Sequence, residues 1–397
     1  MMLVMNQIKN KVVIWGTDNS HALGVIRQLA NSNLDVLFLV NGKSKKCAVA
    51  SKYCEKKYFV NSLNGGLQYL LNNYKDKDNK AVLLLMGDAV AEFTDKNRDK
   101  LLPFFHMSGT LEQGLLSRVD DKIVMSEIAK KHGFVIPESV EFGYGYPVEK
   151  VSYPCIVKPI FLATGRLEFK SYICWCKRDL EGLMKLINRD NKYILQRYIP
   201  KECDLLITGY RGKNGKVVLG GTYYKDRWSD DGGGSHGYLV PDIPEYCNPI
   251  GIKSFLEEIA YYGLFSVEYG LYDGIAYFFE FNLRNDGTSH IFYQCGANLP
   301  LSWVYDCIGY DNDIPTKVHG KKYAINEILD QINIVRGKVS KIQWEIDKAN
   351  ATAFYFYDPN DLEPWKIAKR TAWFNRLFRS LLLKYRPMIV FWLNKLK

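Results

Sequence analysis

The chain has 397 residues, 47% of them hydrophobic and 14% aromatic, and a formal net charge of +10. This length predicts two domains and an extension, and this hydrophobic content excludes an intrinsically disordered chain. Nine bases and no acid follow Glu363, while the rest of the chain is near neutral, which argues against a nucleic-acid partner for the folded domains.

Residues 1–108 predict a Rossmann-like α/β domain. Residues 11–16 and 36–40 have the apolar runs of buried strands, and a helix is expected between them from about residue 21 to residue 30. The run AVLLLMGDAV adds another strand, so we expect a parallel, doubly wound sheet. A nicotinamide-dependent oxidoreductase built on this domain is one alternative, but Gly16 and Gly24 do not form the G-x-G-x-x-G fingerprint of dinucleotide-binding folds.

Residues 109–335 predict an α+β domain. Asp120 or Asp121 can cap a helix, and Lys122 falls in its first turn, where the helix dipole disfavours a cation unless an anion lies in front of it. Farther along, Lys158 ends the apolar strand SYPCIVKPIF. An isolated ammonium is costly to desolvate, so this lysine either binds a phosphate or reaches solvent at the end of the sheet.

The most informative segment is the predicted hairpin VEYGLYDGIAYFFEFNLRNDGTSH, residues 267–290. Side chains alternate along a strand, so one face of the second strand is expected to carry Glu280, Asn282 and Arg284. The other face, which is expected to pack into the core, carries Phe279, Phe281 and Leu283.

The loop of this hairpin decides whether Glu268 joins the polar face. A three-residue loop over 272–274 would place Glu268 opposite Phe278 and on the face of Glu280, whereas a two-residue loop would separate the two glutamates. Two carboxylates and an amide oxygen are hard ligands of the kind that Mg²⁺ prefers, and Arg284 beside them suits a phosphoryl group or a carboxylate. The alternative is a glutamate–arginine ion pair on a solvated sheet face.

The spacing E-x11-E-x-N-x-R resembles the metal-binding strands of the ATP-grasp superfamily of carboxylate-amine ligases. The resemblance implies a Rossmann-like pre-ATP-grasp domain followed by an α+β ATP-grasp domain with A and B subdomains. It implies ATP and Mg²⁺ as cofactors, with Mn²⁺ as an alternative ion. The implied metal ligands are Glu268, Glu280 and Asn282, the phosphate-binding lysines are Lys122 and Lys158, and the catalytic residues are Arg284, Lys225 and Arg227.

The strand YILQRYIP resembles the hinge strand of the same superfamily. Its backbone over Gln196, Arg197, Tyr198 and Ile199 is then expected to bind the adenine edge, although the family often has an acid where Arg197 stands. The resemblance implies that Asp204, with Glu202 as the alternative, holds the ribose hydroxyls.

Softer resemblance links GTDNSHALGVIRQLA, FNLRNDGTSH and FYFYDPNDLEPW to the D-aspartate ligase branch of the superfamily. It implies transfer of the ATP γ-phosphoryl to a substrate carboxylate, followed by attack of an amine on the acyl phosphate, with an amino acid as the amine and a role in cell-wall or surface-glycan synthesis. Asp286 stands where relatives tend to carry a small residue, which points to a substrate that differs from the substrates of those relatives.

Two segments fit this family only in part. The loop FLATGRLEFK, expected to cover the phosphates, has the single glycine Gly165 and would have to rely on Thr164, Arg166 and Lys170. The glycine-rich stretch YYKDRWSDDGGGSHGYLV predicts either a flexible loop over the active site or an ordinary hairpin loop.

Residues 336–397 predict a C-terminal extension that contains a basic amphipathic helix. Its apolar positions at helical spacing are Phe374, Leu377, Phe378, Leu381 and Tyr385. Such a helix favours peripheral contact of residues 371–397 with an anionic membrane, or packing on the body or on a second subunit of a homodimer. A membrane-associated nucleotide-binding protein without ligase activity is the third class, and the complete hairpin pattern argues against it.

The nine cysteines show no paired spacing of the zinc or disulfide type, which indicates a reducing compartment. The start of the chain has no charged leader with a cleavage site, and no uncharged apolar span is long enough to cross a bilayer. We therefore expect a cytoplasmic protein without a signal peptide, with the inner face of the membrane as an alternative location.

Overall fold

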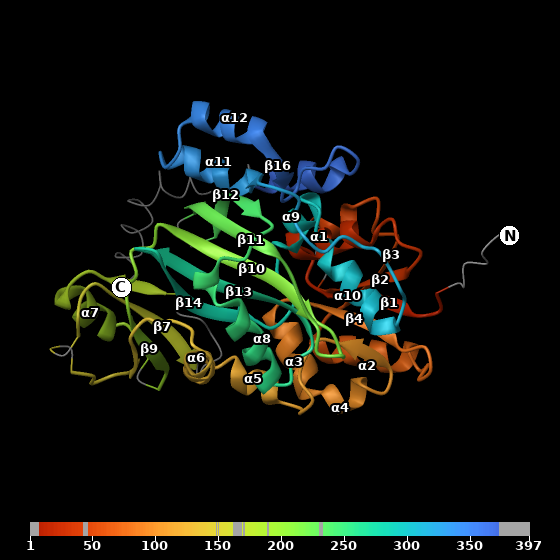
Figure 1. Ribbon diagram of the computed structural model, residues 1–397, viewed down its shortest axis with the longest axis horizontal. Helices are drawn as coiled ribbons and strands as arrows, with labels where there is room; N and C mark the ends of the chain where they lie inside the picture. The colour runs from red at the N-terminus through yellow and green to blue at the C-terminus, as the bar shows by residue number, and fades with distance from the viewer. Residues whose placement is uncertain are drawn as a thin grey trace, which may run out of the picture.

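Three β-sheets form the framework of the chain, and the largest lies between the other two (Figure 1). This computed structural model describes residues 8–42, 47–147, 149, 151–161, 169, 171–188, 190–229 and 233–372. The predicted phosphate loop over 162–170, except for Phe169, and the tail over 373–397 with its amphipathic positions lie outside these residues.

The N-terminal sheet is parallel, with the strand order β3-β2-β1-β4-β5. Its strands are β1 (Lys11–Gly16), β2 (Asp35–Asn41), β3 (Lys56–Val60), β4 (Ala81–Met86) and β5 (Phe105–Met107). Its helices are α1 (Ser20–Leu29), η1 (Ala48–Ala50), α2 (Leu63–Asn73), α3 (Asp88–Lys96) and α4 (Arg98–Leu101). The central strands β1 and β4 are almost wholly apolar because α1 covers one face of the sheet and α2 and α3 cover the other, whereas the edge strand β3 is largely exposed. The predicted Rossmann-like sheet is thus confirmed.

The seven-stranded sheet has the order β14-β13-β10-β11-β12-β15-β16, and only β15 and β16 pair in parallel. Its strands are β10 (Cys203–Arg211), β11 (Val217–Trp228), β12 (Gly234–Val240), β13 (Gly263–Tyr272), β14 (Ile275–Asn282), β15 (Lys322–Ile325) and β16 (Ala351–Phe354). One apolar face packs against α5 (Leu115–Val119), α6 (Lys122–Lys131) and α8 (Pro249–Glu258). On the other face, α9 (Ser289–Gln294) packs on the sheet and α10 (Leu299–Ile308) joins the core of the N-terminal domain.

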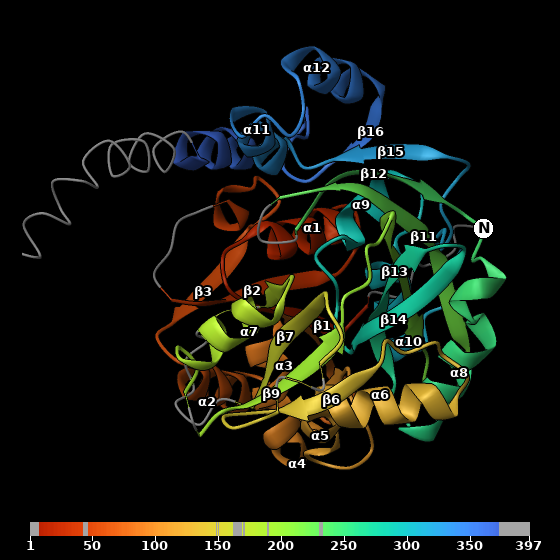
Figure 2. The ribbon, with the colours of Figure 1, turned by 90° about the vertical axis from the view of Figure 1, so that its left-hand side faces the viewer.

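The four-stranded sheet is antiparallel, with the order β6-β9-β7-β8. Its strands are β6 (Ser139–Phe142), β7 (Cys155–Phe161), β8 (Tyr172–Cys174) and β9 (Lys192–Arg197), and α7 (Lys177–Met184) covers its apolar face. Figure 1 shows this sheet at the opposite end of the molecule from the N-terminal sheet, and in Figure 2 that end faces the viewer. Its second face carries Lys158 and Gln196, so polar groups line the side that α7 leaves uncovered.

The C-terminal extension packs on both larger sheets. In the structure the extension begins with α11 (Glu327–Val335), before the predicted boundary at residue 336, and continues with α12 (Lys341–Asn350), β16 and a helix over residues 362–372. Arg27 of α1 donates from Nε to Asp361, with the two atoms 2.9 Å apart and both side chains almost fully buried. This ion pair fixes the extension to the N-terminal domain. No helix in the described ranges is both long and apolar enough to cross a membrane.

Candidate active site

The two glutamates of the predicted hairpin are direct partners on neighbouring strands. Glu268 of β13 lies opposite Glu280 of β14, and Asn282 donates from Nδ2 to Glu268 Oε1 over 3.2 Å. The shared face is as predicted, but the predicted three-residue loop is wrong. The turn has two residues, Asp273 and Gly274, both with positive φ.

A β-bulge explains how a two-residue turn still brings the glutamates together. Tyr269 pairs with Phe278 and Glu268 pairs with Glu280, so Phe279 is the extra residue on β14. The extra residue reverses the face of everything after it on the strand. The expectation that Phe279 belongs to the core is therefore wrong, because Phe278 and Phe281 are buried there and Phe279 is only half-buried.

Phe279 instead marks the junction of the large and small sheets. The ammonium of Lys158, which comes from β7 of the small sheet, lies 5.3 Å from the centre of the Phe279 ring. Lys158 Nζ also donates to Gln196 Oε1 on β9, over 3.0 Å. The phosphate-binding lysine predicted from the sequence thus faces the strand that carries Glu280.

Lys225 of β11 lies among the carboxylates of the same sheet face. Burial disfavours its charge, but Glu268, Asp286 and Asp204 outweigh that effect and raise the pKa of Lys225. Burial also raises the pKa of Glu268, and Lys225 opposes this rise while Glu280 adds to it. A Cβ at Gly234 would come within 2.9 Å of the Lys225 side chain, so the glycine leaves room for it.

Arg284 connects the hairpin to the N-terminal domain. Its Nη2 donates to Asn282 Oδ1 over 3.1 Å, and its Nε donates to Asp88 at the start of α3. Asp286 lies on its other side, with 4.0 Å between Arg284 Nη1 and Asp286 Oδ2. Arg284 and Lys225 together lower the pKa of Asp286, although burial opposes this shift.

The helix that carries Lys122 is capped as predicted by one of two candidate aspartates. Asp121 accepts from the backbone of Ile123 and Val124, and Lys122 is the first residue of α6. The other candidate, Asp120, ends α5 instead. Burial, followed by the charge of Asp88, raises the pKa of Asp120 to about 7, with Glu280 contributing and Arg284 opposing.

The hinge strand offers one free backbone donor at the position where the adenine edge is predicted. The amides of Arg197 and Tyr198 donate to the carbonyls of Glu138 and Pro154. Among the described residues, the amide of Ile199 has no acceptor, and the next residue is a proline.

Asp204, the residue predicted to hold the ribose hydroxyls, forms an ion pair. Lys201 Nζ donates to both oxygens of Asp204, at 2.6 and 2.7 Å, and Trp228 Nε1 donates to one of them. A ribose would therefore meet a carboxylate whose charge is already compensated.

Arg227 lies in a second, larger ion-pair cluster. Its Nε and Nη2 donate to Asp330 of α11, and its Nη1 donates to Asp347 of α12 over 2.9 Å. The Asp330 side chain is fully buried. Because two aspartates accept from this guanidinium, Arg227 fixes α11 and α12 to β11, and its catalytic role stays a prediction.

The glycine-rich stretch after Arg227 is part of a hairpin. Ser229 donates from its backbone to the Gly233 carbonyl over 2.9 Å, directly before β12 begins at Gly234. Residues 230–232, which would form the loop itself, lie outside the described residues, so the two alternatives for this stretch stay predictions.

Several residues near the site were not singled out by their sequence context. Asp88 and Asp286 raise the pKa of His21, but burial dominates and lowers it overall. Tyr355 of the extension is close enough to Asp286 and Glu268 for their charges, after burial, to raise its pKa. These residues come from three distant segments, so no local pattern could have assembled them.

The two glycines of the first βαβ unit have structural roles. A Cβ at Gly16 would lie 2.4 Å from the Met86 side chain, and one at Gly24 would lie 2.6 Å from His290 Cβ. His290 itself is buried, which lowers its pKa to about 3, and its Nε2 lies 2.6 Å from Gln294. Close packing explains both glycines without a dinucleotide.

Metal binding would need ligands from outside the protein. Across the described parts of the chain, no cluster of three or more His, Cys, Asp or Glu side chains is arranged to hold a metal ion. Glu268, Glu280 and Asn282 supply two carboxylates and one amide, which suits a hard ion that keeps oxygen ligands from a bound phosphate.

Comparison with known proteins gives one curated sequence relative and many similar folds. A D-aspartate ligase from Enterococcus faecium is 25% identical over 259 residues, which cover 59% of this chain and 60% of that protein. The chain thus spans less than two thirds of that relative's length. No family model matches the chain.

Solved structures match over more of the chain at low identity. N5-carboxyaminoimidazole synthetase from Staphylococcus aureus, solved with ADP, has a TM-score of 0.66 at 13% identity and covers 84% of this chain and 87% of that one. L-amino acid ligase from Bacillus licheniformis has a TM-score of 0.59 at 15% identity, with 79% of each chain covered. These likenesses confirm the predicted fold class.

Proposed function

We propose that this chain, which has the ATP-grasp fold and resembles a D-aspartate ligase, is an ATP-dependent ligase that joins a substrate carboxylate to an amine. The observation that carries the proposal is the meeting of Glu268, Glu280 and Lys225 on one sheet face with Lys158 from the other sheet. An ion pair on a solvated sheet face does not account for Lys225, which is buried among these carboxylates.

The nucleotide is expected to bind at the junction of the two sheets. Ile199 NH is the free hinge donor for the adenine edge, and Phe279 offers an aromatic face beside the phosphate lysine. Lys158 and Lys122 then hold the phosphates, and an anion in front of α6 compensates for a cation in the first turn of that helix.

Mg²⁺ fits the ligand set of the hairpin. Glu268, Glu280 and Asn282 would hold it together with phosphate oxygens, and Mn²⁺ is the alternative ion. When bound, the ion neutralises charge on the phosphates. Arg284 and Lys225 supply positive charge at the same face, where charge develops during phosphoryl transfer.

The proposed reaction has two steps. The carboxylate oxygen of the acid bonds to the γ-phosphorus and ADP leaves, which gives an acyl phosphate. The nitrogen of the amine then bonds to the acyl carbon, inorganic phosphate leaves, and the amine loses a proton. Positioning and charge stabilisation suffice for both steps, so no protein nucleophile is needed.

The substrates are proposed from the sequence relative and from the position of Arg284. We propose an amino acid as the amine, in line with the name of the relative. From the sequence resemblance we also propose a cell-wall or surface-glycan precursor as the acid, in an enzyme of the cytoplasm. The strand order of the N-terminal sheet changes direction between β1 and β4. Asp88, which follows the carboxyl end of β4, accepts from Arg284 and so brings Arg284 close to this position. Ligands of open α/β sheets bind at such positions.

Calorimetry with Mg·ATP tests the nucleotide site without knowledge of the substrates. We expect wild-type protein to bind ATP, and binding of neither ATP nor ADP would overturn the proposal. NADH titrated in parallel tests the oxidoreductase alternative, for which the packing of Gly16 and Gly24 gives no support.

A substrate screen read by ADP and phosphate release tests the reaction. Release should require Mg²⁺, an acid and an amine together, and Glu280→Gln should lower it at least ~100-fold. Glu257→Gln is the matched control, since Glu257 is an exposed glutamate on α8. Equal losses in the two variants would count against the site.

A further inference from the structure

The C-terminal extension contains a helix whose apolar side faces outward. In α11 the buried residues include Glu327, Asp330 and Asn333, which are spaced three apart on one side. Ile328, Ile332 and Val335 are four and three residues apart and therefore lie along another side of the helix, where Val335 is 56% exposed. Helices on a protein surface normally show the opposite arrangement, with apolar residues inward.

Polar contacts explain why α11 lies this way. The Glu327 carboxylate accepts from the backbone amides of residues 355–357, and Asp330 holds Arg227. Asn333 donates to Ser235 Oγ over 2.9 Å. Because the inward side is fixed by these contacts, the side with Ile328 and Ile332 stays partly exposed, and among the described residues the helix over 362–372 lies beside it.

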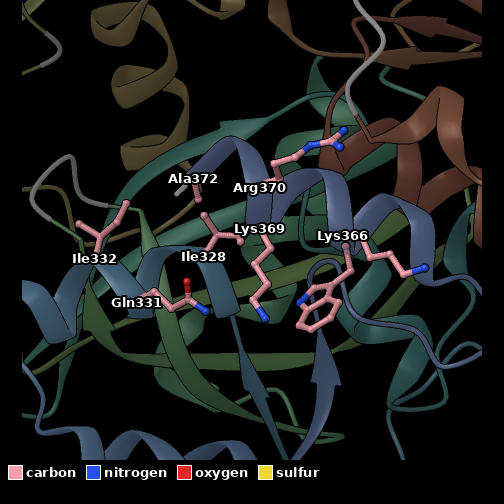
Figure 3. A pocket seen from close by; sticks show the side chains of 8 residues that line it. Ile328, Gln331, Ile332, Lys366, Lys369, Arg370 and Ala372 are labelled. Carbon is pink, nitrogen blue, oxygen red and sulfur yellow. The ribbon is translucent and has the colours of Figure 1, made fainter. Parts of the chain in front are cut away.

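A groove lies along this outward side (Figure 3). It has a volume of about 400 Å³ and runs between α11 and the helix over 362–372. Its lining residues are Ile328, Gln331, Ile332, Trp365, Lys366, Lys369, Arg370 and Ala372. In Figure 3, Lys369 extends toward α11 while Arg370 points away from it. The Lys369 ammonium lies 4.6 Å from the Trp365 ring centre.

The positive charge of the groove favours an anionic partner. Three bases and no acid line it, and within the described ranges Lys366 alone of the three has a carboxylate partner, Glu363. The sequence beyond residue 372 adds six more bases and no acid. A second copy of this chain would bring the same positive charges face to face in a twofold interface. An anionic surface with an apolar interior satisfies both the bases and the isoleucines.

We propose that the groove between α11 and the helix over 362–372 docks onto an anionic phospholipid bilayer, with Ile328, Ile332 and Trp365 at the acyl boundary and Lys369 among the phosphates. A tryptophan and lysines at one edge are the residues that favour the membrane interface. The inference is independent of the proposed reaction.

The test is sedimentation of the full chain with phosphatidylcholine vesicles that contain or lack phosphatidylglycerol. Wild-type protein should bind only the anionic vesicles, and Lys369→Glu should weaken this binding roughly tenfold or more. The matched control is Lys100→Glu on α4, which changes net charge equally at the far end of the molecule (Figures 1 and 2). We expect less than about a twofold effect for this control.

A second variant tests the apolar part of the site. Ile332→Ser keeps every charge and should weaken vesicle binding about threefold or more, with thermal unfolding measured to show that the fold is kept. Equal effects of Lys369→Glu and Lys100→Glu would assign binding to overall charge and overturn the proposal. So would competition by soluble inorganic phosphate, or loss of a dimer in Lys369→Glu with vesicle binding unchanged.

Discussion

Arg227 is the residue for which sequence and structure make opposite predictions. The sequence predicts a contact with the transferred phosphate, whereas the structure places its guanidinium between Asp330 and Asp347. Arg227→Met would leave the Asp330 carboxylate, which is fully buried, without its partner. Breaking a buried pair in this way costs about 3–5 kcal/mol, because the remaining charge stays desolvated.

Urea unfolding followed by tryptophan fluorescence measures this cost. We expect Arg227→Met to lower the free energy of unfolding by about 3 kcal/mol or more, while Arg178→Met, at an exposed arginine of α7, changes it by less than about 0.5 kcal/mol. The double variant Arg227→Met with Asp330→Leu should recover much of the loss, since an apolar pair can replace a buried ion pair. ATP affinity in calorimetry should stay near that of wild type in the single variant.

A different result would refute the reasoning. Arg227→Met could instead keep the free energy of unfolding of wild type but lose ADP release with saturating substrates. That result would show that the guanidinium acts on the phosphate and that its ion pairs with Asp330 and Asp347 do not stabilise the fold. Failure of Asp330→Leu to rescue the single variant would likewise show that the two side chains are not coupled.

Phe279→Ala should weaken ATP binding about fivefold in calorimetry, from loss of roughly 1 kcal/mol of ring contact, and should destabilise the fold less than Phe278→Ala, whose ring is buried; the reverse order would place Phe279 in the core. Asp120 has a pKa raised to about 7, so its protonated form is favoured in the folded protein, and its contribution to stability is lost as pH rises through 7. The unfolding temperature of Asp120→Asn should therefore rise relative to that of wild type between pH 5 and pH 8, and a constant difference between the two would show that the carboxyl titrates normally. Mg²⁺ titrated without nucleotide should show no tight site, because the hairpin supplies two carboxylates and an amide and the described residues hold no larger metal-binding group; saturation of a tight Mg²⁺ site in the absence of ATP would contradict the ligand set.

Local patterns predicted the elements and the chemistry of the site. Apolar runs separated by a helical segment were enough to predict the parallel N-terminal sheet, and alternation along one strand was enough to group Glu280, Asn282 and Arg284. A cation in the first turn of α6 pointed to an anion because helix dipoles act over one turn. Each of these signals spans only a few residues, which is why the sequence alone carries them.

Tertiary structure decided which side chains meet. One extra residue at Phe279 reversed the face of β14, and a one-residue shift in a strand cannot be seen in its alternation. The partners of Arg227, the charge around Asp120 and the outward apolar side of α11 all depend on segments that are far apart in the chain. Such contacts follow from packing of the whole molecule and leave no periodic trace in the sequence.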